Sequence, residues 1–125
     1  MKTNESAENY LETILVLSHK QPSVRAVDIA EELGFKKSSV SVAMKHLREK
    51  NHIIVSKEGH ITLTQSGKEI AEMIYERHQT ISHALILLGV DEATACQDAC
   101  KIEHVISKPS FEAIKNHLKK SALSD

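Results

Sequence analysis

Apolar residues in the first half of the chain change their spacing, and the spacing predicts three helices followed by a hairpin. A period of three to four residues is typical of a helix with one buried face, and three segments before residue 51 show it. Gly34 is expected to end the second of them, because glycine tolerates the left-handed conformation that follows many helices. Beyond residue 52, two β-branched runs flank Glu58 and Gly59, a pattern typical of a β-hairpin. The predicted elements are helices over residues 5–18, 27–33 and 37–50 and strands over residues 53–57 and 60–64.

The helical period returns in the second half and predicts three more helices. The first is long and carries His78 within an otherwise apolar stripe that ends at Leu88. The order of helices, tight turn and hairpin in the first half is that of a winged helix-turn-helix. We therefore predict a mainly α fold with a small β-hairpin wing: an N-terminal winged helix-turn-helix DNA-binding domain over residues 1–64, then a helical domain over residues 65–125. The first of these three helices is predicted to run from a cap at Thr64 to Leu88, and the second from a cap at Asp91 to His104. The third is predicted to begin at a cap formed by Ser107 or Ser110.

The composition is that of one small helical protein. Apolar residues make up 41% of the 125 positions, which is enough for a modest core and a dimer interface. No apolar run reaches the length of a membrane span, and the first residues lack the apolar stretch of a signal peptide. A cytoplasmic protein without membrane contact is expected.

Basic residues gather in one segment although the whole chain is nearly neutral. The formal net charge is -1, yet residues 34–57 carry six basic side chains and one acidic, so this segment is +5 and the remainder -6. A basic stripe on an acidic body suits a protein that touches DNA phosphates with one face, whereas the alternative is a solvated helix face. The motif order favours DNA, because the second helix of a helix-turn-helix enters the major groove.

The predicted helix over residues 37–50 and the hairpin turn carry side chains suited to double-stranded DNA. Serine hydroxyls bind phosphates or base edges, basic groups neutralise phosphates, and the exposed apolar Val42 is suited to a thymine methyl group. Lys57 and His60 flank the hairpin turn and are expected to reach the adjacent DNA backbone. The candidate DNA contacts are Lys36, Lys37, Ser38, Ser39, Ser41, Val42, Lys45, Arg48, Lys57 and His60. Four further histidines are expected on the surface, namely His19, His46, His52 and His117.

Metal ligands of three types gather on the predicted helix that ends at His104. Cys100, Glu103 and His104 share one patch, on which a thiolate, a carboxylate and an imidazole are able to hold one cation. The alternative is a helix end with a capping histidine and buried thiols. His78 has no obvious partner in the sequence, and a metal would supply one. Cys96, one turn before Cys100, is either a further ligand or a bystander.

Several stretches of the chain, taken in order from Ser6 to Leu118, resemble a known family. They are NYLETI, VDIAEELG, SSV, ITLTQSG, ERH, LLGVDE and CKIEHVIS. They are similar to the diphtheria-toxin-repressor family of iron- and manganese-dependent regulators. The resemblance implies a homodimer whose winged helices bind a pseudo-palindromic operator, with residues 65–125 as the metal-binding and dimerisation domain. It also implies repression of metal-uptake genes when the metal is plentiful.

The resemblance implies a ligand set that mixes two branches of the family. Cys100 follows the iron branch and Glu12 the manganese branch, while Asn9 departs from the methionine of the first and the aspartate of the second. Cys96 stands where iron-branch members have a histidine of their ancillary site. Because a thiolate favours Fe²⁺ over Mn²⁺, we expect Fe²⁺ as the activator ahead of Mn²⁺, with Zn²⁺ and Co²⁺ binding in vitro. By the resemblance, one metal site is made of Asn9, Cys100, Glu103 and His104. Glu12 and His78 match positions used by the manganese branch or by the family's second site.

Two rival functions are weaker on the residues. A small metalloenzyme would leave the basic segment unexplained, and no nucleophile, oxyanion donor or glycine-rich substrate loop accompanies the ligands. A winged-helix regulator with thiol redox sensing would use Cys96 and Cys100, but these lie one turn apart on one helix, so a disulfide between them would constrain little else. We expect no enzymatic activity.

Overall fold

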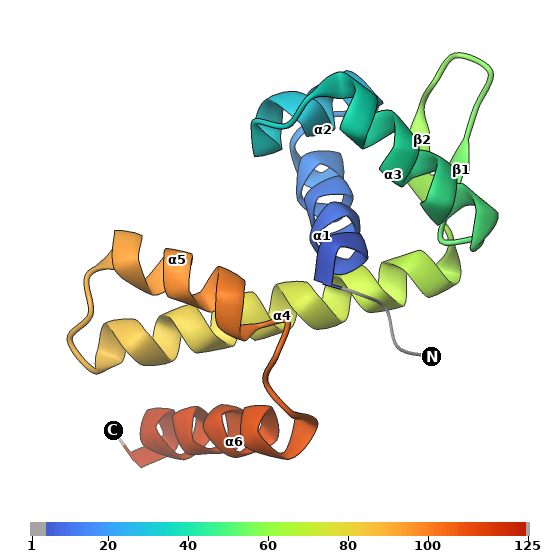
Figure 1. Ribbon diagram of the computed structural model, residues 1–125. Coiled ribbons are helices and arrows are strands. Elements are labelled where there is room, and N and C mark those ends of the chain that lie inside the picture. The colour runs from blue at the N-terminus through green and yellow to red at the C-terminus, as the bar shows by residue number, and fades with distance from the viewer. Residues whose placement is uncertain (1–4, 125) are drawn as a thin grey trace. The chain divides into compact units, whose positions relative to one another are not determined.

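The computed structural model describes residues 5–124, with side chains described to residue 121, and contains six helices and one hairpin within that range (Figure 1). The predicted fold class, mainly α with an N-terminal winged helix-turn-helix, is confirmed. In chain order the elements are α1 (Glu5–Lys20), α2 (Ala26–Leu33), α3 (Lys37–Glu49), β1 (Ile53–Val55), β2 (Ile61–Leu63), α4 (Gln65–Leu87), α5 (Glu92–Ile102) and α6 (Lys108–Ser124).

The chain packs as two compact units that share α4. The first unit extends to Met73 and the second begins at Ile74, so the division falls inside this one helix. The predicted domain boundary after residue 64 divides the chain by function, between DNA binding and metal binding, and it stays a prediction.

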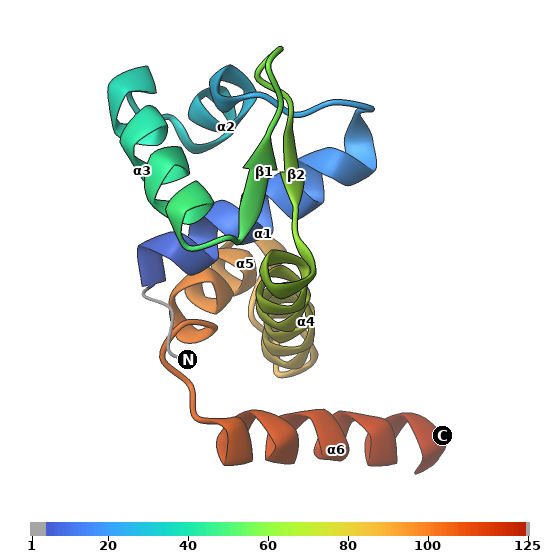
Figure 2. The ribbon, with the colours of Figure 1, turned by 90° about the vertical axis from the view of Figure 1, so that its right-hand side faces the viewer.

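The first unit has one core, to which α1, α2, α3 and β1 all contribute. Leu11, Ile14, Ile29, Val40 and Ile53 are almost fully buried there. Figure 2 shows α3 and the hairpin side by side above α1. This packing follows from the helical period of the apolar residues, which gives each helix one buried face.

The turn between α2 and α3 forms as predicted. Gly34 has a left-handed φ of 70°, and its N–H donates to the carbonyl of Ala30 over 2.9 Å. Arg25 is the N-cap residue of α2. Its backbone N–H donates over 2.9 Å to the carboxylate of Asp28, which lies in the first turn of the helix. The helix-turn-helix is therefore fixed at both ends of α2.

The hairpin is confirmed, with shorter strands than predicted. β1 pairs antiparallel with β2, with Ile53 opposite Leu63 and Val55 opposite Ile61. The strands end early because the turn already begins at Ser56, whose carbonyl accepts the N–H of Gly59 over 3.0 Å. Gly59 has a φ of 85°, which favours glycine.

His52 is buried, so its predicted surface position is wrong. Its N–H donates to the carbonyl of Leu47, and its Nδ1 lies 3.0 Å from the hydroxyl oxygen of Ser66. The local reason is Asn51, whose φ of 63° turns the chain inward after α3. A Cβ at Gly67 would lie 2.0 Å from the His52 carbonyl oxygen, so the first turn of α4 rests directly on this backbone. His19, His46 and His117 are exposed, as predicted.

The second unit has a smaller core, to which α4, α5 and α6 contribute. Ile81, Ala99 and Phe111 are buried in it. Asp91 caps α5 as predicted, and the bond from the Thr94 backbone N–H to this carboxylate holds the pKa of Asp91 below its usual value. Before α6, the Ser107 hydroxyl accepts the backbone N–H of Ser110 over 3.3 Å, so Ser107 is the cap.

Two predicted helix ends in this unit differ from the structure. The helix expected to reach His104 ends at Ile102, and Glu103 is its C-cap. Leu88 was expected on the apolar stripe of α4, but it lies just beyond that helix and is 82% exposed. The helical period continues past the last helical residue in both places, so the apolar pattern alone places the end too late.

Candidate metal site and nucleic-acid interface

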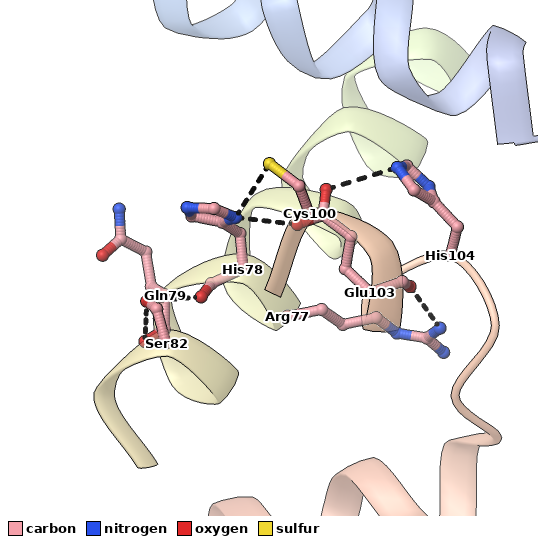
Figure 3. Close-up of polar contacts among 7 residues, drawn as sticks. All are labelled: Arg77, His78, Gln79, Ser82, Cys100, Glu103 and His104. Carbon is pink, nitrogen blue, oxygen red and sulfur yellow. Dashed lines mark hydrogen bonds and ion pairs between the residues drawn. The ribbon is translucent and has the colours of Figure 1, made fainter. Parts of the chain in front are cut away.

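Three types of metal ligand converge within the second unit (Figure 3). His78 comes from α4, Cys100 from α5 and Glu103 from the C-cap of α5, and one ligand atom from each lies within 4.8 Å of the others. The His78 Nδ1 lies 2.8 Å from Glu103 Oε1 and 3.9 Å from Cys100 Sγ. An imidazole nitrogen thus faces a carboxylate and a sulfur at once.

The helical positions of these residues explain why they meet. Cys100 and Glu103 are three residues apart, so their side chains leave the same face of α5 and its C-cap. Ala99, the neighbour of Cys100, has no exposed surface and packs against Ile81 in the core, which holds α5 against α4. His78 is three residues before Ile81 on α4, so it lies on the side of α4 that meets α5.

Glu103 gives the clearest sign that the site is suited to a cation. Its side chain has no exposed surface, and ionised carboxylates are rarely buried unless they are paired or bind a metal. Oε1 is bonded to His78, whereas Oε2 has no hydrogen-bond partner in the described part of the chain and lies 3.5 Å from His104 Nε2. Thiolate, imidazole and carboxylate together fit a divalent transition metal.

The remaining predicted ligands lie in three places. His104 is in the turn after α5, next to Glu103. Cys96 is a half-buried free thiol one turn before Cys100, and it is not among the three residues that converge in the described chain. Asn9 and Glu12 belong to α1 in the first unit, and their part in the metal site stays a prediction.

The predicted DNA-reading face is solvent-exposed along α3. Val40, Met44 and Leu47 point into the core, which leaves the other sides of the helix to solvent. Val42 is 57% exposed, a high value for an apolar side chain beside serines and lysines. The exposed candidates on and just before α3 are Lys36, Lys37, Ser38, Ser39, Ser41, Val42, Lys45 and Arg48, and Lys57 is exposed in the hairpin turn.

Arg25 is a basic residue at the hairpin that the sequence alone did not single out. Its Nη2 lies 3.0 Å from Nε2 of His60, so the two side chains share one place beside the hairpin turn. His60 is half-buried and accepts this bond, which makes it a support for Arg25 as well as a candidate DNA contact. Arg25 lies outside the basic segment of residues 34–57, and no local pattern joins it to His60.

Two family models match nearly the whole chain. The N-terminal DNA-binding domain of iron-dependent repressors matches residues 2–61, and the metal-binding and dimerisation domain of the same repressors matches residues 64–123. The chain belongs to the iron-dependent repressor family. It is a metal-responsive DNA-binding regulator and not an enzyme, and the predicted family resemblance is confirmed. The family assignment also favours metal over redox sensing by Cys96 and Cys100.

Curated relatives agree with this assignment. An uncharacterised HTH-type transcriptional regulator of Methanocaldococcus jannaschii is 34% identical over 119 residues, which cover 94% of this chain and 95% of the relative. The HTH-type transcriptional regulator MntR of Bacillus subtilis is 34% identical over 112 residues, covering 90% of this chain and 79% of MntR.

Solved structures share the fold. The manganese regulator SloR matches with a TM-score of 0.81 and 26% identity over 95% of this chain, and a manganese-dependent transcriptional repressor in complex with manganese matches with a TM-score of 0.84 and 27% identity over 90%. The chain spans 55% and 52% of these two structures, respectively. Among the described helices, none is both long and apolar enough to cross a membrane.

Proposed function

We propose that this protein is a homodimeric repressor of metal-uptake genes that binds its operator when Fe²⁺ or Mn²⁺ is bound. The single observation that carries the proposal is the buried Glu103, which His78 and Cys100 approach within the distances of a metal site. A regulator of transcription acts on the chromosome, so a cytoplasmic location is part of the proposal.

In the second unit the proposed ligands come from α4, from α5 with its C-cap, and from the turn after it. A bound cation supplies positive charge against the buried carboxylate of Glu103 and the Cys100 thiolate, and His78 and His104 complete the set with neutral nitrogens. Asn9 and Glu12 join it by the family resemblance, and Cys96 is proposed only as an additional ligand. Fe²⁺ is proposed ahead of Mn²⁺ because of the thiolate, although several relatives are named for manganese.

The proposed DNA contact is the major groove, entered by α3. The exposed serines and Val42 face the bases, and the lysines with Arg48 face the phosphates. Arg25 and Lys57 are proposed as backbone contacts beside the hairpin. Two copies of α3 must lie about 34 to 36 Å apart, or a multiple of that, to enter successive major grooves of one operator, so DNA binding depends on how the dimer holds them.

The proposed dimer face is an apolar groove between the end of α4 and α6. The groove has a volume of about 490 Å³ and lies wholly in the second unit. Leu87 and Leu88 are 61% and 82% exposed at its edge, and exposed apolar patches of this kind are typical of protein interfaces. A second copy of this chain is the occupant that the dimerisation domain calls for. The groove is lined by Ala84, Leu87, Leu88, Ile114, His117 and Leu118, among others.

A fluorescence anisotropy titration tests this function. A labelled candidate operator is titrated with the protein at fixed salt, first with chelator and then under anaerobic conditions with Fe²⁺, Mn²⁺, Co²⁺ or Zn²⁺. We expect binding only with metal, because a coupling of about 1 to 3 kcal/mol per linked equilibrium is typical and two heads act together.

Variants of the ligands make the test specific to the site. Glu103→Ala and His104→Ala are each expected to abolish the metal stimulation while the circular dichroism spectrum stays that of a folded protein. Equal operator affinity with chelator and with metal in the parent would overturn the function. Unchanged metal stimulation in folded Glu103→Ala would overturn the site.

A further inference from the structure

Arg77 directly precedes His78 on α4 and binds the end of α5. Its Nη1 donates to the carbonyl oxygen of Glu103 over 3.2 Å (Figure 3). It also donates to the carbonyl oxygen of Ile106 over 3.1 Å. The first of these acceptors belongs to the residue whose carboxylate lies at the centre of the proposed metal site. Two adjacent residues of α4 thus serve the same site: His78 is a candidate ligand, and Arg77 binds the backbone of Glu103, another candidate ligand.

The half-buried side chain of Arg77 on α4 contacts both the end of α5 and the start of α6. Its Nε is buried and has no hydrogen-bond partner in the described part of the chain. Its Cζ lies 5.6 Å from the centroid of the Phe111 ring near the start of α6, within the range of a cation–π contact. An arginine that leaves a buried N–H unpaired has a cost in stability, which only its remaining contacts offset.

Arg77 binds the carbonyl side of a segment whose N–H groups are already held by the helix. The Glu103 N–H donates to the carbonyl of Ala99 over 2.9 Å, and the Ile106 N–H donates to that of Ile102 over 2.9 Å. α5 ends at Ile102, so Glu103 and His104 lie where the last carbonyl groups of a helix lack intrahelical partners. A fixed positive charge also suits this end of a helix, because the helix dipole is negative there. Together with these N–H bonds, the two bonds from Arg77 hold the C-cap and the turn after it from the carbonyl side.

We propose that Arg77 is a positioning residue of the metal site. By fixing the backbone of Glu103 it sets the direction of the Glu103 carboxylate and of the turn that carries His104, and so it sets metal affinity and coordination geometry. This inference rests on the proposed function, since it concerns the ligands of the same site. It adds a residue that touches no metal and that no ligand pattern in the sequence would select.

Cobalt titration of the full chain with Arg77→Met tests the proposal. Co²⁺ bound by a thiolate absorbs light in a charge-transfer band, and its visible bands report coordination geometry. We expect Arg77→Met to lower Co²⁺ affinity by about 10- to 100-fold, the usual effect of removing an outer-shell partner, and to change the visible bands. Co²⁺ affinity within about twofold of the parent, with unchanged bands in the folded variant, would overturn the proposal.

Lys115→Met is the matched control. Lys115 Nζ lies 2.9 Å from Glu76 Oε2, so this pair also joins α6 to α4, at the position next to Arg77. The bond to Glu76 raises the pKa of the Lys115 ammonium, so the control likewise removes a full positive charge. It leaves the backbone of Glu103 untouched, and we expect Co²⁺ affinity to stay within about twofold of the parent. An equal loss of affinity in both variants would assign the effect to general packing and overturn the positioning role.

Arg77→Lys keeps the charge on a different donor group and guards against a variant that fails to fold. We expect its Co²⁺ affinity to lie between those of the parent and Arg77→Met, and parent-like affinity and bands in Arg77→Lys would count against the proposal if Arg77→Met does not fold. The cobalt spectrum of the parent protein distinguishes failure of the proposed metal site from failure of the proposed role of Arg77. Absence of a thiolate-to-cobalt band in the parent overturns the proposed site itself, whereas a normal band in both parent and folded Arg77→Met overturns only the role of Arg77.

Discussion

Cys100 decides the chemistry of the proposed site at the scale of single residues, because it is the only sulfur among the three converging ligands. The thiolate favours Fe²⁺, Co²⁺ and Zn²⁺, whereas a carboxylate at the same position would favour Mn²⁺. The selectivity of the site therefore depends on the Cys100 side chain. Cys100 is exposed, so a larger side chain fits at this position.

Cys100→Glu is expected to move activation towards Mn²⁺. The measurement is the ratio of Mn²⁺ to Fe²⁺ concentrations that give half-maximal operator binding under anaerobic conditions. We expect this ratio to fall by roughly tenfold or more, because even outer-shell changes alter metal affinity by about 10- to 100-fold. Cys96→Ala is the control and should leave the ratio near that of the parent if Cys96 is a bystander. A ratio that does not move in Cys100→Glu would remove Cys100 from the ligand set.

The sequence predicted all three residues that converge, but not every contact among them, for a physical reason. Helical spacing places Cys100 and Glu103 on one face of α5 and its C-cap, whereas His104 lies in the turn beyond the helix, where that spacing no longer applies. His78 was notable because it lacked a local partner, and its partner is Glu103, which is 25 positions further along the chain. The burial of His52 left no trace in the sequence pattern, because it depends on the left-handed turn at Asn51 and on the contact with Ser66 at the start of α4 rather than on any local period.

At the scale of elements, α3 combines two separable tasks. Lys37 and Arg48 are proposed to meet phosphates, which have the same charge in every sequence, whereas Val42 is proposed to meet a base. Lys37→Ala or Arg48→Ala should weaken binding to all DNA sequences and reduce the slope of log affinity against log salt by about 0.9 for each lost contact. Val42→Ala should keep the salt slope and relax preference at a thymine. Parent-like slopes in both charge variants would mean that α3 is not the reading element.

The junction between α3 and α4 makes a second element-scale prediction. In most helices Gly→Ala stabilises by about 1 kcal/mol, but at Gly67 the new Cβ would meet the His52 carbonyl. We expect Gly67→Ala to lower the free energy of unfolding by about 1 to 3 kcal/mol, as other overpacking substitutions do. Urea denaturation measures this change, with the exposed Glu72→Ala on the same helix as control. A Gly67→Ala protein as stable as the parent would show that the two backbones do not meet this closely.

The whole molecule is proposed to act as a dimer. Leu88, at the edge of the groove between α4 and α6, is too exposed to serve the core of one chain. Leu88→Glu should raise the dimer dissociation constant by roughly 30-fold, equivalent to about 2 kcal/mol, because a charge would be buried at the interface. Sedimentation equilibrium measures it, and Ile54→Glu in the first unit, where Ile54 is 59% exposed, serves as the control. Equal weakening in both variants, or none in Leu88→Glu, would place the interface elsewhere.

The hydrogen bond between His78 and Glu103 means that a metal must compete with a contact already made inside the protein. Nδ1 of His78 lies 2.8 Å from Oε1 of Glu103 and 3.9 Å from Sγ of Cys100, so the atoms proposed to hold a cation also hold one another. Metal loading is then an exchange of partners. The measured metal affinity is the strength of the new bonds less that of the contact they replace.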